Sequence, residues 1–559
     1  MNHEQVFLQE IVEHPDDDTP RLVFADWLEE RGDAASRARA EFIRVQFALR
    51  DLSPDDPLRV QMEERERDLR LANEAAWLAP LRQHCRVEGC LFRRGFVERV
   101  AMRMRDVLED ADHLFRLAPV QEIALRSSAG GEPQSLRQTR MQRLASSPHL
   151  QRLRALDLGD FNYSGHEDPI DRLLSSMYLT RLNRLSIDLG YLSGSLATLL
   201  NVPFLSGLTR LQVSGYRTRG QSIESLFRSP RLTSLETLDL IGAGLTTGEL
   251  LAIAGSVDLK RLKVLRIASN TLGADGVRGL MSARGLPSLT SLDLSDNNLT
   301  SSDIRELAGS ALLGQLESLS LTMNRLHHEA VVALAASSRV SRLRRLNLNT
   351  TRIKPNSIAA LAKAPHFEHL TTLLLRTNRL GDAGLQALCR ATGLPQLTVL
   401  GLSYNGIGPA GVRLLAQEPP GRLTTLDLSW NPLTDDAVRA LADSPKLASL
   451  AALDLSYAQL GDEAARALAE SPYLNNLHTL NLSTNRIGDT GLHALANTSA
   501  LPHLTALNLG YNALSEAGVR TLADSPLFAR LTALNLAGNR IDPARLAELR
   551  RDFRGTLGG

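Results

Sequence analysis

Leucines recur along most of the chain with the fixed spacing L-x-x-L-x-L-x-x-N-x-L. Clear copies are LTSLDLSDNNL (289–299), LTTLDLSWNPL (423–433) and LTALNLAGNRI (531–541). Fifteen copies begin within residues 153–531, and from Leu208 onward every step is 27 residues except one of 26. The L-x-L alternation places leucines on one side and mostly polar residues on the other. This pattern predicts a short strand in each copy.

A second pattern follows each strand and predicts a helix. GDAGLQALCRATGLP (381–395) and GDTGLHALANTSALP (488–502) carry leucines and alanines at helical spacing and end at a proline. The asparagine of the repeat comes where the chain leaves the strand, and its amide can satisfy backbone groups that stacking buries. Each copy is therefore predicted to be strand, turn, helix and return, and only a stack of copies can bury the leucines.

This repeat resembles the leucine-rich repeat family, in the longer, helix-bearing class typified by ribonuclease inhibitor. The resemblance covers residues 119–541, in which VQEIAL (120–125) is a degenerate sixteenth copy. It implies an α/β solenoid shaped as a horseshoe, with a parallel sheet on the concave face and helices on the convex face. Residues 542–559 are expected to cap the last repeat, with Leu546 and Leu549 of an amphipathic helix turned inward.

Residues 1–50 do not repeat and predict a small helical domain. Three helices are expected, over about 4–13, from Thr19 as the cap, and over 36–49. RLVFADWLEERGD (21–33), followed by RAEFIRVQ, resembles the bacterial repeat-companion domain, a module that precedes repeat arrays. The resemblance implies a docking or adaptor role. In the second helix a buried stripe is expected, formed by Leu22, Val23, Trp27 and Leu28.

Four acidic residues of this domain, Asp26, Glu29, Glu30 and Glu41, have two interpretations. They could be acid–base or metal-binding carboxylates, or they could form ion pairs on a solvated helix surface. No histidine or cysteine cluster accompanies them, so the structural interpretation is favoured.

Residues 51–118 predict a transition between the helical domain and the repeats. The expected elements are a charged helix, an alternating strand over 90–102 and a further helix. Arginines concentrate over residues 82–154, which either form a groove for nucleic acid or solvate helix surfaces. The second interpretation is favoured because few aromatic residues for base stacking accompany them.

The composition limits the classes of function. The 63 Lys+Arg and 62 Asp+Glu residues give a net charge of +1, which argues against a general polyanion binder. Three cysteines exclude a disulfide framework, and no secretion signal or membrane span is evident, so a cytoplasmic location is expected. Cys85 and Cys90 with His84 could bind zinc only if His113 joined them, and coincidence is favoured. No catalytic or phosphate-loop motif is present, so neither an enzyme nor a cofactor is expected.

The outward positions of the repeats carry the candidate partner-binding residues. The third, fifth and seventh positions are expected to face outward, with the eighth at the rim. The fifth positions form a polar row and the eighth an aromatic row: Asp427, Asp454, Asn481 and Asn508; Tyr404, Trp430, Tyr457 and Tyr511. A second candidate surface is basic: Arg184, Arg210, Arg266 and Arg345. Exposed aromatic rings beside carboxylates are typical of protein recognition, although tyrosine is also a common filler of this position.

The sequence thus predicts a non-enzymatic protein–protein interaction scaffold that binds a protein partner on its concave face, with neither nucleic acid nor membrane as partner. A regulator of a GTPase or other signalling enzyme is one alternative. A second alternative is an enzyme subunit with activity in residues 51–118. The identity of the partner and the oligomeric state are left open.

Overall fold

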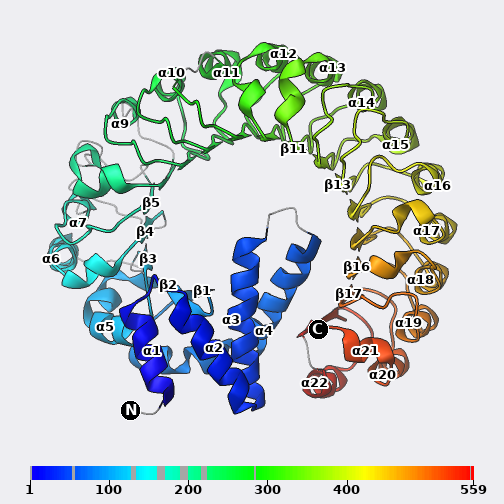
Figure 1. The fold of residues 1–559 in the computed structure, drawn as a ribbon, viewed down its shortest axis with the longest axis horizontal. Helices are drawn as coiled ribbons and strands as arrows, with labels where there is room; N and C mark the ends of the chain where they lie inside the picture. The colour runs from blue at the N-terminus through cyan, green and yellow to red at the C-terminus, as the bar shows by residue number, and fades with distance from the viewer. Residues whose placement is uncertain are drawn as a thin grey trace. The chain divides into compact units, whose positions relative to one another are not determined.

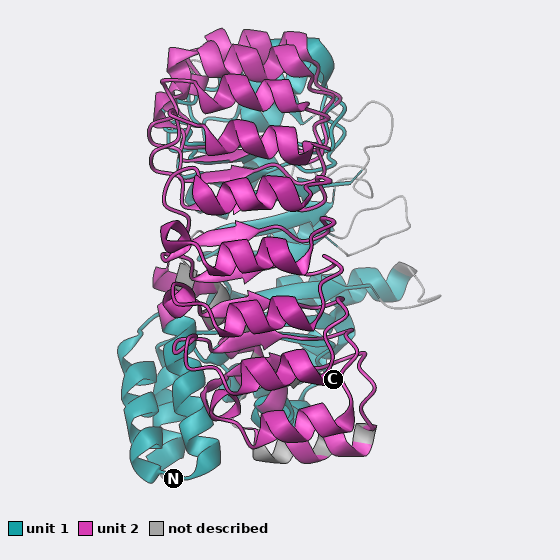
Figure 2. Cartoon of the chain, turned by 90° about the vertical axis from the view of Figure 1, so that its right-hand side faces the viewer, with its two compact units in different colours: residues 1–47, 73–297 teal, residues 48–72, 298–559 magenta. Residues whose placement is uncertain are grey.

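The structure is a computed structural model. It describes residues 3–52, 57–127, 134–159, 170–188, 199–215, 223–281, 285–553 and 556–558. The chain divides into two compact units: residues 1–47 with 73–297, and residues 48–72 with 298–559 (Figure 2).

The chain begins with helices. Their bounds are α1 His3–Glu13, α2 Thr19–Arg31, α3 Ala34–Asp51 and α4 Pro57–His84. The first three lie where three helices were predicted. Helix α2 ends at Gly32, whose φ of 74° is the left-handed conformation of a helix C-cap. Its N-cap is Asp18 rather than Thr19, so the predicted cap is wrong by one residue.

The predicted buried stripe of α2 is wrong in part. Leu22 and Val23 are 40% and 46% exposed, whereas Phe24, Ala25 and Leu28 are buried. The buried residues follow Arg21 at steps of three, four and seven, which is the spacing of one helical face. This face packs into a core with, among others, the following residues: Ile11, Ala40, Ile43 and Phe96.

The region predicted as one strand over 90–102 is a β-hairpin. Strand β1 (Gly89–Arg93) pairs antiparallel with β2 (Phe96–Arg103). The two residues between them, Arg94 and Gly95, have φ of 51° and 84°, the left-handed pair that a tight hairpin turn requires. Positive φ at both residues interrupts the strand that alternation alone predicted.

The first unit continues from β2 through seven further parallel strands among its described residues. The strands are β3 Glu122–Arg126, β4 Ala155–Leu158, β5 Arg184–Asp188, β6 Arg210–Ser214, β7 Thr237–Asp239, β8 Val264–Arg266 and β9 Ser291–Asp293. The helices are α5 Met104–Leu117, α6 Gln134–Ala145, α7 Ile170–Leu174, α9 Glu224–Phe227, α10 Thr247–Gly255 and α11 Gly273–Met281. Short 3-10 turns are η1 Pro148–Arg152 and η3 Pro203–Gly207.

The second unit repeats the same arrangement with parallel strands throughout its described residues. The strands are β10 Ser318–Ser320, β11 Arg345–Asn347, β12 Thr372–Leu374, β13 Val399–Gly401, β14 Thr425–Asp427, β15 Ala452–Asp454, β16 Thr479–Asn481, β17 Ala506–Asn508, β18 Ala533–Asn535 and β19 Thr556–Gly558. The helices are α12 Ser301–Gly309, α13 His328–Ala336, α14 Pro355–Ala362, α15 Gly381–Cys389, α16 Pro409–Gln417, α17 Asp435–Ala442, α18 Asp462–Ala469, α19 Asp489–Ala496, α20 Glu516–Ala523, α21 Pro526–Arg530 and α22 Pro543–Asp552. The 3-10 turns are η4 Leu313–Gln315, η5 Ser338–Arg342, η6 Pro445–Leu447 and η7 Leu474–Asn476.

The last element differs from the prediction for the C-terminus. Helix α22 is present and Leu549 is buried, but Leu546 is only half-buried. Beyond the helix, β19 adds a parallel strand to β18. The sequence did not indicate this strand, because residues 556–558 carry a single leucine and two small or polar neighbours.

Each unit has a sheet with the repeat helices on one face (Figure 1). Neighbouring strands are in register, so that Leu426 lies opposite Leu453 and Leu453 opposite Leu480. These leucines are at most 1% exposed, and burying one leucine contributes about 1.5–3 kcal/mol. The predicted fold class, an α/β leucine-rich-repeat solenoid preceded by a helical region, is confirmed. The sheet face turned away from the repeat helices is called the open face below.

Candidate protein-binding surface

A row of buried asparagines holds the chain where it leaves each strand. Asn405 is 1% exposed, and its Nδ2 donates to the carbonyl oxygens of Leu375 and Leu402, each at 2.9 Å. Its Oδ1 accepts from the backbone N–H of Asn378 at 3.0 Å and of Leu380 at 3.3 Å. The role predicted for this asparagine is therefore observed. The amide of Asn405 thus joins its own repeat to the preceding one.

The residue before the asparagine position of the repeat has a left-handed backbone, also where that position holds Ala458. Values of φ are 56° at Tyr404, 57° at Trp430, 54° at Tyr457 and 56° at Tyr511. The conformation is a property of the repeat, since Met323 has φ of 58° at the equivalent position. It costs a non-glycine residue roughly 1–2 kcal/mol.

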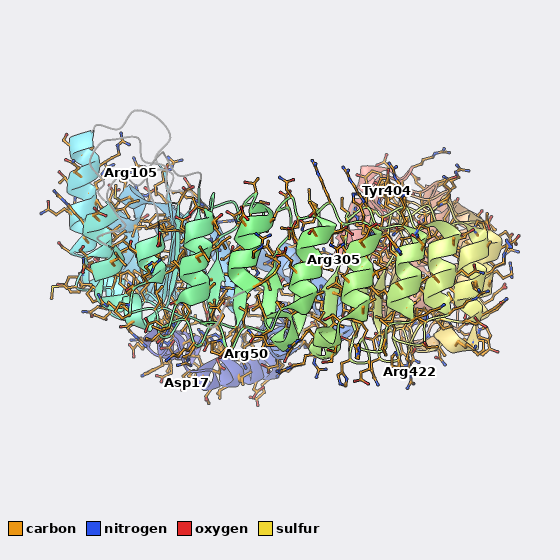
Figure 3. All side chains as sticks on the ribbon, turned by 90° about the horizontal axis from the view of Figure 1, so that it is seen from above. Asp17, Arg50, Arg105, Arg305, Tyr404 and Arg422 are labelled. Carbon is orange, nitrogen blue, oxygen red and sulfur yellow. The ribbon has the colours of Figure 1, made fainter. Side chains whose placement is uncertain are left out.

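Backbone hydrogen bonds between repeats hold this conformation. The N–H of Tyr404 donates to the carbonyl of Ser429 at 3.0 Å, and that of Trp430 donates to Ser456 at 2.9 Å. Because the next repeat supplies the acceptor, the backbone geometry is imposed whatever side chain it carries. The side chain is thereby held at the edge of the sheet, and Figure 3 shows Tyr404 at one edge with Arg422 at the opposite edge.

Four aromatic side chains occupy this position in the second unit and form what we call the aromatic row. They are Tyr404, Trp430, Tyr457 and Tyr511, which are 53%, 43%, 42% and 64% exposed. Trp430 and Tyr457 stack with ring centroids 3.7 Å apart and planes within 11°. Tyr404 is tilted against Trp430 at 5.9 Å. Stacked, half-exposed rings give a rigid apolar surface that loses little entropy on binding.

Tyr511 depends on a glycine of the next repeat. A Cβ atom at Gly538, whose φ is 69°, would lie 2.4 Å from the ring of Tyr511. Gly538 therefore leaves the space in which this ring lies. A hollow of about 380 Å³ lies beside the stacked pair and is lined by Trp430, Asn431, Pro432, Tyr457, Gln459, Thr484, Asn485 and Arg486.

The polar row has a structural role as well as an exposed position. The Oδ1 atom of Asp427 accepts from the backbone N–H of Ser429 at 2.9 Å and from its hydroxyl at 2.6 Å. Asp454 bonds Ser456 in the same way, and Asn481, Asn508 and Asn535 likewise accept from the N–H two residues on. These side chains stabilise the turn after each strand.

The prediction that the seventh repeat position faces outward is wrong for three neighbouring repeats of the second unit. Ser403, Ser429 and Ser456, which occupy it, are 1%, 6% and 6% exposed. The strand ends at the fifth position, so the strict alternation that the prediction assumed does not continue. The hydroxyls of Ser429 and Ser456 turn toward the carboxylates of Asp427 and Asp454, and the hydroxyl of Ser403 lies 2.9 Å from that of Ser429.

Asp427 and Asp454 lie directly opposite each other on β14 and β15. Burial raises the pKa of Asp427, and the charge of Asp454 adds to the increase. We expect Asp427→Asn to raise the free energy of unfolding at pH 7 by about 0.5–1 kcal/mol, since it removes opposed like charges. The amide keeps the oxygen that accepts from Ser429.

The pH dependence of this gain identifies its cause. Because the folded-state pKa of Asp427 is above its ordinary value of 3.8, the wild type regains stability as the pH falls through the folded-state pKa. The gain should be full at pH 7 and vanish near pH 3.8 in thermal melts. Asn481→Asp is the matched control and should destabilise at pH 7, because it places a further carboxylate beside Asp454. A gain that is independent of pH would contradict the explanation.

A larger hollow of about 520 Å³ lies on the open face of the second unit. Strands β14–β18 line it with positions three to five of their repeats, and Arg67 and Leu71 of α4 complete the lining. It combines the polar row with apolar atoms of the strands, so a polypeptide segment could contact both kinds of group there.

Of the four arginines predicted to form a basic surface, the structure places only two next to each other. Arg184 and Arg210 are direct neighbours on β5 and β6. Arg266 lies on β8, 3.8 Å from the carboxylate of Asp239. Arg345 lies on β11 of the second unit, where burial lowers its pKa.

The acidic residues of the helical region form ion pairs. Arg44 Nη2 donates to Asp26 Oδ1 at 2.8 Å, and its Nη1 donates to Glu29. Glu30 is exposed and Glu41 is half-buried. The structural interpretation of Asp26 and Glu29 agrees with these contacts.

Many arginines of residues 82–154 are also paired with carboxylates. Arg86 contacts Asp110 at 2.8 Å, and Arg103 contacts Glu88 at 2.6 Å. These arginines form ion pairs between neighbouring elements at the surface. Such pairing agrees with the interpretation of this stretch as a solvated surface. The sequence did not indicate which carboxylates they would meet.

The cysteines lie in surroundings that disfavour the thiolate. Burial raises the pKa of Cys85 and Cys90 to about 11 and that of Cys389 to about 12. His84 and His113 stack with ring centroids 5.4 Å apart. Across the part of the chain that the structure describes, no three His, Cys, Asp or Glu side chains are placed to hold a metal ion. Likewise, no helix within the described ranges has the length and apolar character to cross a lipid bilayer.

Comparison with known proteins identifies the repeats. The family model described as Leucine Rich repeat matches residues 285–308, 368–389, 394–416, 423–442, 446–469, 473–496 and 500–523. These seven segments are thus leucine-rich repeats. No curated protein sequence matches it.

Solved structures with similar folds come from several sources. A chain of the Rad7 and Elc1 complex from yeast is 18% identical, with a TM-score of 0.42, over 57% of this chain and 80% of that one. An internalin of Listeria monocytogenes is 21% identical, with a TM-score of 0.36, over 68% and 87%. A leucine-rich repeat protein of Leptospira interrogans is 20% identical, with a TM-score of 0.38, over 75% and 98%.

Proposed function

We propose that the chain is a non-enzymatic scaffold that binds a protein partner through the aromatic row and the adjacent open face of its second unit. The observation that carries this proposal is the stack of Trp430 on Tyr457, two large rings that are each more than 40% exposed. Tryptophan and tyrosine are the residues most enriched at the energetic centres of protein interfaces. Their backbone is rigid, so binding costs little ordering.

The surroundings of the stack fit a protein ligand. The hollow beside Trp430 and Tyr457 offers Gln459 and Arg486 as hydrogen-bonding groups. The polar row supplies two carboxylates, at Asp427 and Asp454, on neighbouring strands. An apolar centre with a polar surround is the usual anatomy of a protein interface. We expect the partner to place an apolar side chain against the rings and basic or amide groups over the polar row.

The test separates binding from folding. In the double variant Trp430→Gly, Tyr457→Gly, glycine accepts the left-handed backbone without strain, which offsets its entropy cost, so the melting temperature should stay close to that of the wild type. Partners enriched from an extract of the source cells would be identified, purified and titrated against the full chain. We expect the double variant to lose at least about 30-fold in affinity, as two interface hot spots would.

The matched control is Thr350→Gly. Thr350 has φ of 55° at the equivalent position of another repeat and carries no ring. It should retain wild-type affinity. If the double variant bound the purified partner within about threefold of the wild type, less than 1 kcal/mol, the aromatic row would not be the contact surface.

Three finer features belong to this proposal. The repeats are of the ribonuclease-inhibitor-like class, residues 1–50 are a bacterial repeat-companion domain that acts as an adaptor, and the protein acts in the cytoplasm. Their support is the helix in each repeat, the RLVFADWLEERGD motif, and the three cysteines that form no disulfide. Nucleic acid and membrane are not proposed as partners.

A further inference from the structure

Four arginines line one hollow on the open face of the first unit. The hollow has a volume of about 440 Å³, and its charged lining is Arg93, Arg99, Arg184, Arg210, Glu122 and Asp157. Strand register builds it, since Arg99 lies opposite Glu122 and Arg184 lies opposite Arg210. Ala155 lies between Glu122 and Arg184 in the same row. Its methyl group leaves the space that a larger side chain would fill.

The carboxylates neutralise only part of this charge. Arg93 donates to Glu122 at 2.7 Å, and Arg99 donates to Asp157 at 2.6 Å. Arg184 Nη2 is 3.6 Å from Glu122, beyond ordinary hydrogen-bond distance. Four guanidinium groups against two carboxylates leave an excess of two positive charges.

The excess is concentrated at Arg184 and Arg210. Arg210 has no ion-pair partner within the described ranges of the chain. Burial lowers the pKa of Arg184, and the charges of Arg93 and Arg210 lower it further. A guanidinium that is partly withdrawn from water and repelled by its neighbours is stabilised by a bound anion. Ser186 and Gln212 lie in the same hollow and offer neutral hydrogen-bond donors.

We propose that this arginine pocket, formed by Arg93, Arg99, Arg184 and Arg210, binds a dianionic phosphoryl group. A phosphate monoester carries about two negative charges near neutral pH and three acceptor oxygens, which match the excess charge and the guanidinium donors. A single carboxylate would leave one positive charge uncompensated. The phosphoryl group belongs either to a free phosphate ester or to a phosphorylated side chain of a partner. The site lies in the first unit and is independent of the aromatic row.

Calorimetric titration of the full chain tests the proposal with three probes at low salt. The probes are inorganic phosphate, ribose 5-phosphate and a Gly-phosphoserine-Gly peptide, with the unphosphorylated peptide as the blank. Saturable binding of the phosphorylated probes and none of the blank is expected. Tighter binding of the phosphopeptide than of ribose 5-phosphate assigns the pocket to a modified side chain, and the reverse order assigns it to a free ester.

The charge of the ligand gives a second signature. The second pKa of a phosphate monoester is near 6, so binding of the phosphopeptide should weaken about fourfold from pH 7.5 to pH 5.5. Sulfate, which keeps two charges over this range, should compete equally well at both pH values.

Variants locate the site. Arg184→Gln and Arg210→Gln should each weaken binding about tenfold, as the loss of one charge-assisted hydrogen bond does. Asp157→Asn keeps the shape, removes a negative charge and should tighten binding. Arg266→Gln is the matched control on the same sheet face outside the pocket, and should bind as the wild type does. Melting temperatures show that each variant is folded.

Three results would overturn the proposal. One is that no phosphorylated probe binds with saturation. Another is that the Arg184→Gln, Arg210→Gln double variant binds like the wild type while folded. The last is that Arg266→Gln weakens binding as much as the pocket variants, which would make the effect a general consequence of positive charge.

Discussion

Replacing Asn405 by alanine is expected to lower the free energy of unfolding by about 3–5 kcal/mol. The carbonyls of Leu375 and Leu402 would each keep one amide donor, from Asn378 and Asn431 respectively. The backbone N–H groups of Asn378 and Leu380 would lose the oxygen that accepts from them. Each buried donor without an acceptor costs roughly 1–3 kcal/mol.

Hydrogen exchange is the suitable measurement, because repeat arrays do not unfold in one cooperative step. Amides of β12 to β14 should exchange faster in Asn405→Ala, whereas amides of β17 and β18 should change little. Asn497→Ala, at an exposed helix end, is the control and should have almost no effect. A loss below about 1 kcal/mol for Asn405→Ala would mean that water replaces the amide.

The chain also allows the reverse substitution, in which an asparagine is introduced into a repeat that has alanine at this position. Ala458 is fully buried at the position that asparagine occupies in most repeats. Its N–H already donates to Asn485 at 3.0 Å. Ala458→Asn should therefore fill this gap in the row and stabilise β14 to β16 by about 1 kcal/mol, measured by the same exchange experiment.

Arg21→Met is the second substitution with a large expected effect, and should cost about 3–5 kcal/mol of local stability. Arg21 is fully buried. Its guanidinium donates to Glu98 at 2.9 Å and to the carbonyls of Pro15 and Asp17, each at 3.0 Å. Methionine would leave the buried Glu98 carboxylate with Arg94 as its remaining cation. This contact joins α2 to β2, so its loss should loosen the helical region.

Exchange protection of α1 and α2 measures the effect. The double variant Arg21→Met, Glu98→Gln should recover much of the loss, because it removes the uncompensated charge. Arg44→Met is the matched control: Arg44 pairs with Asp26 and Glu29 at the surface, and such pairs contribute less than about 1 kcal/mol. If Arg21→Met and Arg44→Met behaved alike, the buried pair would not hold the helices in place.

The candidate site was predictable in its residues but not in its geometry. Trp430 and Tyr457 were identified because repeat spacing places equivalent positions on adjacent strands. Their left-handed backbone was not predicted, because the alternation of apolar and polar residues describes an extended strand. A positive φ at these residues is held by hydrogen bonds to the next repeat. Asp427 was predicted to be an outward residue that binds a partner or solvates the sheet, and the structure adds that its oxygen closes a turn onto Ser429. A pattern of polar and apolar positions does not show which side chains form hydrogen bonds with the backbone nearby.

The arginine pocket was also predictable only in some of its residues, and not in its arrangement. Arg184 and Arg210 were recognised as outward residues of the repeats. Arg93 and Arg99 come from the hairpin, which shares no repeat motif with the later strands, and Glu122 lies in the degenerate copy VQEIAL (120–125). The antiparallel pairing of β1 with β2 and the parallel register of β2 to β6 place these charges together.

The sequence by itself determined the repeat, the buried leucines and the asparagine row. Those features follow from contacts between equivalent positions of successive repeats, and a 27-residue period records these contacts directly. Tertiary structure alone decided which charges meet, why Arg21 is buried, and where the chain takes positive φ. An ion pair between distant segments depends on how those segments fold together, and a backbone with positive φ depends on the neighbouring repeat that holds it. Neither feature produces a periodic pattern in the sequence.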